Sequence, residues 1–167
     1  ILGSSLFGAN LAARLGLPYA FASHFAPQAL TEAVALYRDQ FQPSESLAEP
    51  YVIAALNVIA AETDEEAEAL REQVLASRVR SLARRVPQLA GADLDDDMVA
   101  ELMDTPVGQQ AKHMGTYTVR GSRETVAAGL ADFERLADAD ELMVANVAPG
   151  RDARERTLRV LAEIASA

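Results

Sequence analysis

Strand-like and helix-like segments alternate along this chain, and no other feature constrains its fold as strongly. Four short apolar segments have the character of strands: residues 1–4, 17–25, 51–61 and 141–147. Each is followed by a stretch in which apolar residues recur every three or four positions: residues 6–15, 27–41, 63–86 and 153–164. Strands separated by helices become parallel neighbours through right-handed crossovers, so this pattern predicts an α/β fold.

Residues at the segment boundaries support the alternation. The segment 51–61 is almost continuously apolar, as expected for a central strand that is covered on both faces. Thr63 and Glu66 match a capping box, in which the threonine hydroxyl accepts from a backbone N–H and the glutamate reaches back. Gly16 lies where a helix C-terminus is expected, and Pro27 is expected at the first position of the second helix.

Residues 88–117 interrupt the alternation, and we expect them to form an inserted segment. Within it, the aspartates at 95–97 predict the cap of a short helix that runs through Met103, and residues 106–115 predict another turn or two. The regular pattern returns at Ser122, the predicted N-cap of the next helix. Residues 1–167 are thus expected to form a single partial domain that carries one insertion.

Four strand–helix units are half of what closes a (β/α)8 barrel. Such a half would leave two open sheet edges and part of an apolar helix layer uncovered. We expect an N-terminal half-barrel or a second copy of the chain to cover them, with an open-sheet arrangement as the alternative. The apolar start at Ile1 and Leu2 is expected to lie inside a strand.

The composition disfavours several classes of function. With 25 acidic residues against 15 basic ones, the net charge of -10 disfavours a nucleic-acid partner. The chain contains no cysteine, which excludes disulfides, thiol catalysis and thiolate metal sites and suits the cytoplasm. The longest apolar stretch contains Asn57 and falls well short of the roughly 20 residues that span a bilayer.

The loop after the first strand is the strongest candidate site. Parallel α/β folds bind ligands beyond the carboxyl ends of their strands. There, Gly3, Ser4, Ser5 and Gly8 place two glycines and two hydroxyls at a helix start, which predicts a phosphate cradle. The alternative is that Ser4 or Ser5 merely caps the helix. The pattern is neither a dinucleotide fingerprint nor a P-loop, and Phe7 breaks the nucleophile-elbow pattern of serine hydrolases.

Histidine supplies one further candidate. His24 lies at the carboxyl end of the second strand, where it is expected to face the mouth of a pocket as a proton donor or acceptor. The alternative is a hydrogen-bonded histidine beneath the following helix. His113 is expected to be a solvated loop residue, and the acidic run at 93–97 lacks the pattern of a calcium loop. No metal site is expected.

Several stretches of the chain resemble the luciferase-like flavin-dependent monooxygenases. Residues 1–5 and 15–25, which reads LGLPYAFASHF, resemble the fifth and sixth βα segments of that family. Residues 118–124, TVRGSRE, are similar to the family's GTPEEV motif at a helix start, and residues 51–63 and 141–144 correspond to the seventh and eighth strands. The resemblance covers nearly the whole chain and implies the C-terminal half of a (β/α)8 barrel.

The resemblance also implies a cofactor and a reaction. In that family FMN, or the related deazaflavin F420, lies at the carboxyl face of the barrel, and the loop after the fifth strand holds its phosphate. Gly3, Ser4, Ser5 and Gly8 would then contact the cofactor, although luciferase itself has an acidic residue where this chain has Ser4. The implied reaction is oxidation of a small organic substrate by O2 with reduced FMN, which a reductase supplies. Residues 88–117 would be the mobile segment that closes over the active site.

Three alternatives to this reaction remain open at the level of sequence. The first is an F420-dependent oxidoreductase that transfers hydride, and the second is a non-catalytic half-barrel that binds flavin or self-associates as a dimer. The third is an open-sheet domain that binds another phosphate ligand. No side chain except His24 is a candidate catalytic group, and we expect residues 1–167 alone to be inactive.

Overall fold

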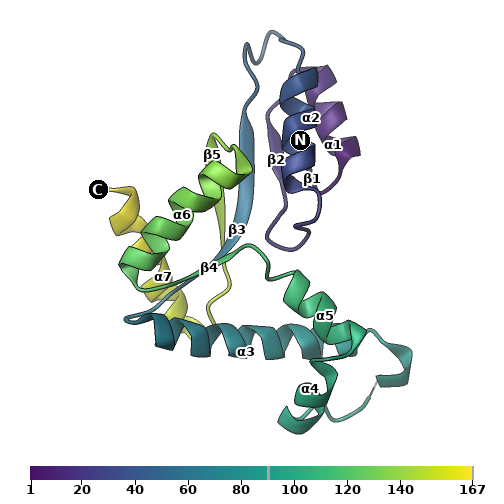
Figure 1. The fold of residues 1–167 in the computed structure, drawn as a ribbon, viewed down its shortest axis with the longest axis vertical. Coiled ribbons are helices and arrows are strands. Elements are labelled where there is room, and N and C mark those ends of the chain that lie inside the picture. Colours follow the sequence, from purple (N-terminus) through teal and green to yellow (C-terminus); the bar gives the residue numbers. More distant parts are fainter. Residues whose placement is uncertain (90, 167) are drawn as a thin grey trace.

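The computed structural model describes residues 1–89 and 91–166 and has a parallel sheet with alternating helices (Figure 1). The strands are β1 (Leu2–Gly3), β2 (Tyr19–Phe21), β3 (Val52–Ala60), β4 (Thr118–Gly121) and β5 (Glu141–Asn146). The helices are α1 (Leu6–Leu15), α2 (Leu30–Gln40), α3 (Asp64–Ala83), α4 (Asp96–Leu102), α5 (Pro106–His113), α6 (Arg123–Ala137) and α7 (Gly150–Ala165). A short 3-10 turn, η1 (Pro87–Leu89), follows α3.

Strand β3 is the centre of the sheet. Strand β2 pairs with its beginning, β5 with its middle and β4 with its end, and all of these pairs are parallel. Asn57 and Val58 are in register with both β4 and β5, so these two strands lie on opposite edges of β3. Strand β4 therefore continues the edge of β3 along which β2 has already ended. All of β3 except Ile53 is buried, as expected for a strand covered on both faces.

Strand β4 is an addition to the four strands that the sequence predicts. The prediction missed it because four residues that include an arginine and a glycine form no apolar run. The backbone explains its presence, since buried N–H and C=O groups at the end of β3 need partners. The Asn57 N–H donates to the Tyr117 carbonyl at 2.9 Å, and the Ala61 N–H donates to the Gly121 carbonyl at 3.0 Å.

The predicted helix caps are confirmed. Thr63 Oγ1 accepts from the Glu66 N–H at 3.2 Å, while the Glu66 carboxylate accepts from the N–H of Glu62 at 3.0 Å. Asp95 and Ser122 accept from backbone N–H groups in the first turns of α4 and α6. Residues 106–115 contain α5, as expected, and Gly16 ends α1 in the left-handed conformation.

Some predicted boundaries were wrong. Helix α2 begins at Leu30, so Pro27 does not occupy its first position; the Leu30 N–H instead donates to the Pro27 carbonyl in a preceding turn. The second strand is limited to Tyr19–Phe21, because the chain turns at Ser23. Helix α3 ends at Ala83, short of the expected Val86.

Two hydrophobic cores follow from this arrangement. The larger one lies between the sheet and helices α1, α2 and α6, and its bulkiest members include Tyr19, Tyr37 and Phe21. The smaller one joins the second half of α3 to α4 and α5 through Val79, Val99 and neighbouring side chains. The inserted segment thus forms a small helical layer on the far end of α3, at the lower right of Figure 1.

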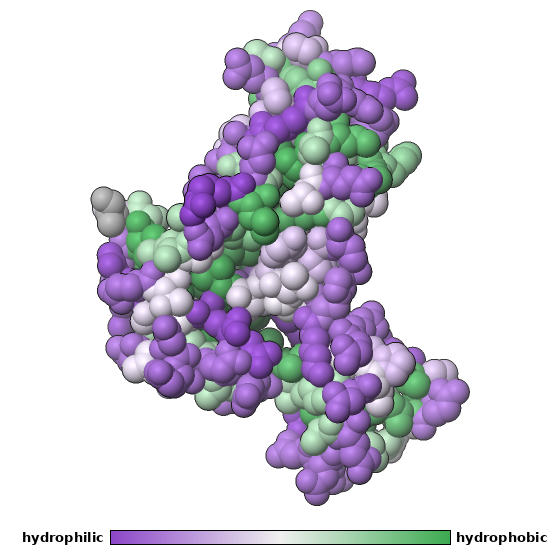
Figure 2. Space-filling model, viewed as in Figure 1, coloured by the Kyte–Doolittle hydropathy of each residue, from purple (hydrophilic) through white to green (hydrophobic). Residues whose placement is uncertain are grey.

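Apolar surface remains uncovered at both edges of the sheet. Within the described residues, β1 and β5 each pair with a neighbour on one side only. Leu2 is 68% exposed, Phe7 78% and Met143 47%. Figure 2 shows hydrophobic side chains along the middle of one face, between the α1–α2 and α6–α7 layers. Among residues 1–89 and 91–166, no helix has the length and apolar character needed to cross a membrane.

The turn from β4 into α6 depends on Gly121. Its φ of 146° is unfavourable for residues with a side chain, and a Cβ there would lie 2.5 Å from Asp64 Oδ1. The Asp64 carboxylate occupies this space because it accepts from the Ser122 N–H at 2.7 Å and from Thr125 Oγ1 at 3.0 Å. These hydrogen bonds lower the pKa of Asp64, and the one from the Ser122 N–H has the largest effect.

We expect Gly121→Ala to lower the free energy of unfolding by about 2 kcal/mol or more, because it adds a clash to an unfavourable backbone conformation. Urea denaturation measures this loss. Gly91→Ala is the matched control, because Gly91 also has a positive φ, 90°, but open space around its Cβ position. Equal losses in the two variants would contradict a steric role for Asp64.

Candidate functional site

The loops that follow the five strands meet at one rim of the sheet, because all the strands are parallel. The turn with Ser4 and Ser5 follows β1, and His24 follows β2. These strands are neighbours, and the Ala22 N–H donates to the Gly3 carbonyl at 2.9 Å. The structure therefore brings two of the sequence-predicted features, the serine turn and His24, to the same rim.

The hydroxyls of the serine turn are available to a ligand. Ser4 and Ser5 are both exposed, and neither hydroxyl forms a hydrogen bond with the described residues. Ser5 occupies the N-cap position of α1 with an extended backbone, yet its side chain does not cap the helix. The first turn of α1 contains no acidic residue, so its free N–H groups face no competing carboxylate of that turn.

Tyr19 supports this turn from beneath. Its side chain is fully buried, and its hydroxyl donates to the Ser5 carbonyl at 3.1 Å. A Cβ on Gly3 or Gly8 would lie 3.5–3.8 Å from the tyrosine ring and hydroxyl, so the two glycines pack directly against it. Burial raises the pKa of Tyr19 to about 12, which keeps the hydroxyl protonated as a donor at neutral pH.

His24 presents an unpaired ring nitrogen at the rim. The side chain is half-buried and packs edge-on against Phe25, with ring centroids 4.8 Å apart. Its Nδ1 is buried and has no hydrogen-bond partner in the part of the chain that the structure describes. Burial, and then the positive charge of Arg78, lower the pKa of His24. The imidazole is therefore neutral at neutral pH, the form that can both accept and donate a proton.

Asn57 holds the His24 loop in place. Its side chain is 1% exposed, and its Nδ2 donates to the His24 carbonyl at 2.7 Å. The adjacent Ser23 hydroxyl, also buried, donates to the Ala55 carbonyl of β3. Sequence reasoning noted Asn57 only as an interruption of an apolar strand. A signal for its role was present in the sequence: an amide side chain inside a buried strand needs hydrogen-bond partners, and a loop at the end of the neighbouring strand can provide them.

The remaining sequence-predicted groups lie away from this pair. His113 is exposed at the end of α5, and Asp96 forms an ion pair with Arg80. In residues 1–89 and 91–166, His, Asp and Glu side chains form no group of three suited to a metal ion. Arg78 was not among the predicted residues, because one more arginine on a charged helix carries no distinctive signal.

Comparisons with known proteins agree with the fold. A family model described as luciferase-like monooxygenase matches residues 1–140. The luciferase-like monooxygenase of Escherichia coli (strain K12) is 40% identical over 144 residues, which is 86% of this chain and 42% of that protein. The crystal structure of apo-MsnO8 matches 99% of this chain and 50% of its own, with a TM-score of 0.69 and 32% identity.

The crystal structure of a riboflavin lyase, RcaE, contains modified FMN and the substrate riboflavin. It matches 99% of this chain and 43% of its own, with a TM-score of 0.60 and 25% identity. The chain thus spans about half the length of the proteins it matches. Together with the parallel sheet, this coverage confirms the predicted half of a (β/α)8 barrel. The chain belongs to the luciferase-like monooxygenase family.

Proposed function

We propose that this chain contributes the phosphate-binding side of an oxidoreductase that uses reduced FMN and O2 to oxidise a small organic substrate. The observation that carries the proposal is the serine turn, in which the Ser4 and Ser5 hydroxyls are exposed and unpaired at the start of α1. Family membership and the modified FMN in the riboflavin lyase structure support a flavin as the ligand.

The turn suits a phosphate group in shape and in charge. Free N–H groups of a helix N-terminus and two hydroxyls all donate hydrogen bonds, and the helix dipole favours an anion there. Helix α3 provides a contrast, because its first turn carries three acidic side chains and Thr63 caps it. Gly3 and Gly8 let the turn pack closely against Tyr19, whose hydroxyl fixes the Ser5 carbonyl.

The roles of the protein in this reaction are binding, orientation and shielding. Bound reduced flavin supplies the electrons for the reaction with O2. The serine turn anchors the phosphate and so fixes the position of the cofactor at the rim. The His24 imidazole accepts or donates a proton there, because the ring is neutral and partly exposed at the rim.

The inserted segment, residues 88–117, covers the site in this proposal. Helices α4 and α5 form their own small core with the far half of α3, and the chain returns to the rim through β4. A packed unit of this kind can close over a cofactor and exclude water from the reaction. Its mobility is part of the proposal.

The open edges at β1 and β5 call for a partner. We propose that an N-terminal half-barrel covers them, with a second copy of this chain as the other candidate. The whole barrel supplies the remaining contacts with flavin and substrate, so residues 1–167 alone are inactive in this proposal.

Replacing both serines of the turn tests the phosphate contact. We expect Ser4→Ala with Ser5→Ala to weaken binding of reduced FMN about tenfold or more, because each hydrogen bond to a charged group contributes about 1.5–3 kcal/mol. Anaerobic titrations measure this change. Riboflavin lacks the phosphate, so its affinity should not change, and Ser77→Ala, at an exposed position on α3, is the matched control. Equal losses for FMN and riboflavin would contradict the proposed contact.

The lowered pKa of His24 predicts a dependence of stability on pH. The folded protein resists protonation of this ring, so the free energy of unfolding is retained above the ordinary pKa of 6.5 and falls as the pH drops below it. His24→Gln should remove this acid-side loss. Denaturation across that range compares the two proteins, with His113→Gln as the control. Parallel stability curves for wild type and His24→Gln would rule out the effect.

The use of O2 separates the proposed reaction from its alternatives. We expect the complete barrel to consume O2 with reduced FMN, followed with an oxygen electrode. Hydride transfer from reduced F420 without O2 uptake would instead support the deazaflavin enzyme. Tight binding of flavin with no turnover in either assay would support a non-catalytic flavin-binding module.

A further inference from the structure

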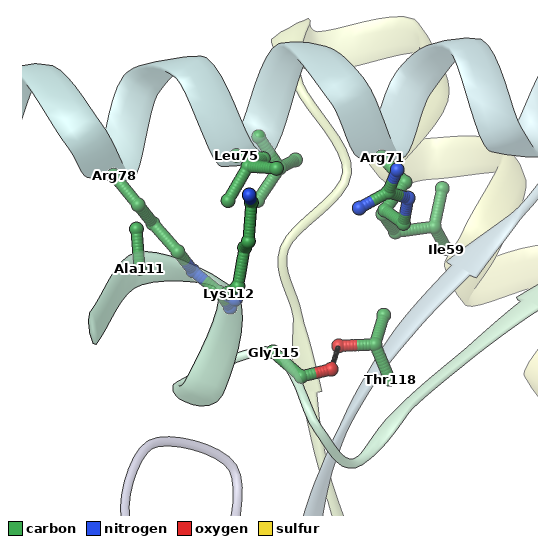
Figure 3. Close-up of a pocket in the computed structure, with 9 residues that line it drawn as sticks. Ile59, Arg71, Leu75, Arg78, Ala111, Lys112, Gly115 and Thr118 are labelled. Carbon is green, nitrogen blue, oxygen red and sulfur yellow. Dashed lines mark hydrogen bonds between the residues drawn. The ribbon is translucent and has the colours of Figure 1, made fainter. Parts of the chain in front are cut away.

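A small pocket beside the end of β3 gathers three cationic side chains. Arg71 and Arg78 come from α3, and Lys112 comes from α5 (Figure 3). Gly115 and Thr118 line its floor, where the inserted segment returns to the sheet. Its volume is about 70 Å³, which leaves room for a group of a few heavy atoms and none for a flavin ring.

Arg78 is the unusual member of this group. Arg71 pairs with Glu68 at 2.6 Å, and Lys112 lies 3.5 Å from Asp104. Arg78 forms neither an ion pair nor a hydrogen bond with residues 1–89 or 91–166, although it is half-buried and burial lowers its pKa. A half-buried guanidinium without a counter-charge, on the wall of a pocket, has its N–H donors free to bind an anion.

Arg78 lies against the turn at Gly115. A Cβ on Gly115 would lie 3.0 Å from Arg78 Nη1, so the guanidinium rests against bare backbone. The turn itself is fixed, because the Gly115 N–H donates to the Lys112 carbonyl at 2.9 Å and Thr118 Oγ1 donates to the Gly115 carbonyl at 2.8 Å. Figure 3 shows Arg78 reaching from α3 across to this turn. The guanidinium thus lies beside a turn that is itself held by hydrogen bonds.

We propose that this pocket, which we call the Arg78 pocket, binds a carboxylate or phosphate group of an acidic organic ligand. A planar guanidinium matches such oxyanions with two parallel hydrogen bonds. Arg71 and Lys112 add positive charge on the flanks, in a protein whose net charge is -10. Ile59 and Leu75 supply an apolar wall that suits the carbon atoms next to the charged group.

The position of the pocket indicates that its ligand is the substrate. Ile59 lies near the carboxyl end of β3, and the charge of Arg78 acts on His24. The pocket therefore lies at the same rim as His24. The assignment of an acidic substrate rests on the proposed function, whereas the anion site itself does not.

Calorimetric titration of the FMN-saturated protein with inorganic phosphate, and separately with acetate, tests the proposal. Saturation with FMN removes the serine turn as a competing phosphate site. We expect Arg78→Gln to weaken binding of the preferred anion about tenfold or more and Arg78→Lys to weaken it less. Arg84→Gln removes the same charge from the exposed position that follows α3, and it should bind as the wild type does. The stronger of the two probes identifies the oxyanion.

Thermal unfolding separates a binding role from a packing role. A ligand that binds only the folded state raises the unfolding midpoint. We expect phosphate or acetate to raise the midpoint of the wild type and of Arg84→Gln but not that of Arg78→Gln. Without added anion, Arg78→Gln should be at least as stable as the wild type, because it removes an unpaired cation. A loss of stability that is the same with and without anion would overturn the proposal.

Flavin titrations keep this proposal distinct from the proposed function. Arg78→Gln should leave the affinity for FMN unchanged; a loss for FMN with none for riboflavin would make the pocket the flavin-phosphate site and overturn the proposal. Normal FMN binding by the double serine variant would refute the phosphate role of that turn and leave the Arg78 pocket standing. If the double serine variant loses FMN binding and the Arg78 pocket of the wild type binds no anion, the anion site is refuted while the phosphate role of the serine turn is supported.

Discussion

Every backbone group of a buried strand needs a hydrogen-bond partner, and in this chain β3 imposes that requirement on the rest of the sheet. Strand β2 meets it at the beginning of β3, and β5 meets it along the opposite edge. Beyond the end of β2, the chain must return from residues 88–117 to supply β4. The rim at which the candidate groups meet is therefore a product of hydrogen bonding along one strand.

The same rim concentrates polar groups that the apolar core cannot accommodate. Asn57 and Ser23 use their side chains to hold the His24 loop, whereas Tyr19 uses its buried hydroxyl to hold the serine turn. In each case a fully satisfied buried donor fixes the backbone of an exposed loop. The exposed hydroxyls of Ser4 and Ser5 are thereby left without partners among the described residues, on a rigid support, an arrangement that would favour binding without reorganisation.

Sequence periodicity was sufficient for the alternation of strands and helices, and local chemistry was sufficient for the caps at Thr63, Asp95 and Ser122. Both are short-range features. Strand β4 could not be predicted from the sequence, because its pairing depends on where β2 ends, and only the register of the folded sheet determines this. Arg78 could not be predicted for a similar reason: whether an acidic side chain lies beside it is decided by the tertiary structure. The placement of the serine turn and His24 at the ends of neighbouring strands could be predicted, because the order of strands and loops is a property of the sequence itself.

Asp64 joins the start of α3 to the start of α6. It opens α3, the helix that leads into the inserted segment, and it accepts hydrogen bonds from Ser122 and Thr125, where the chain begins α6. The excursion that comprises α3, the inserted segment and β4 therefore starts and finishes at a single clamp on the body of the barrel. Closing a loop whose ends are already held together depends only weakly on length, about 0.6 kcal/mol for each doubling. The clamp makes the inserted segment a replaceable module, in which length and sequence can diversify while the register of the sheet stays unchanged.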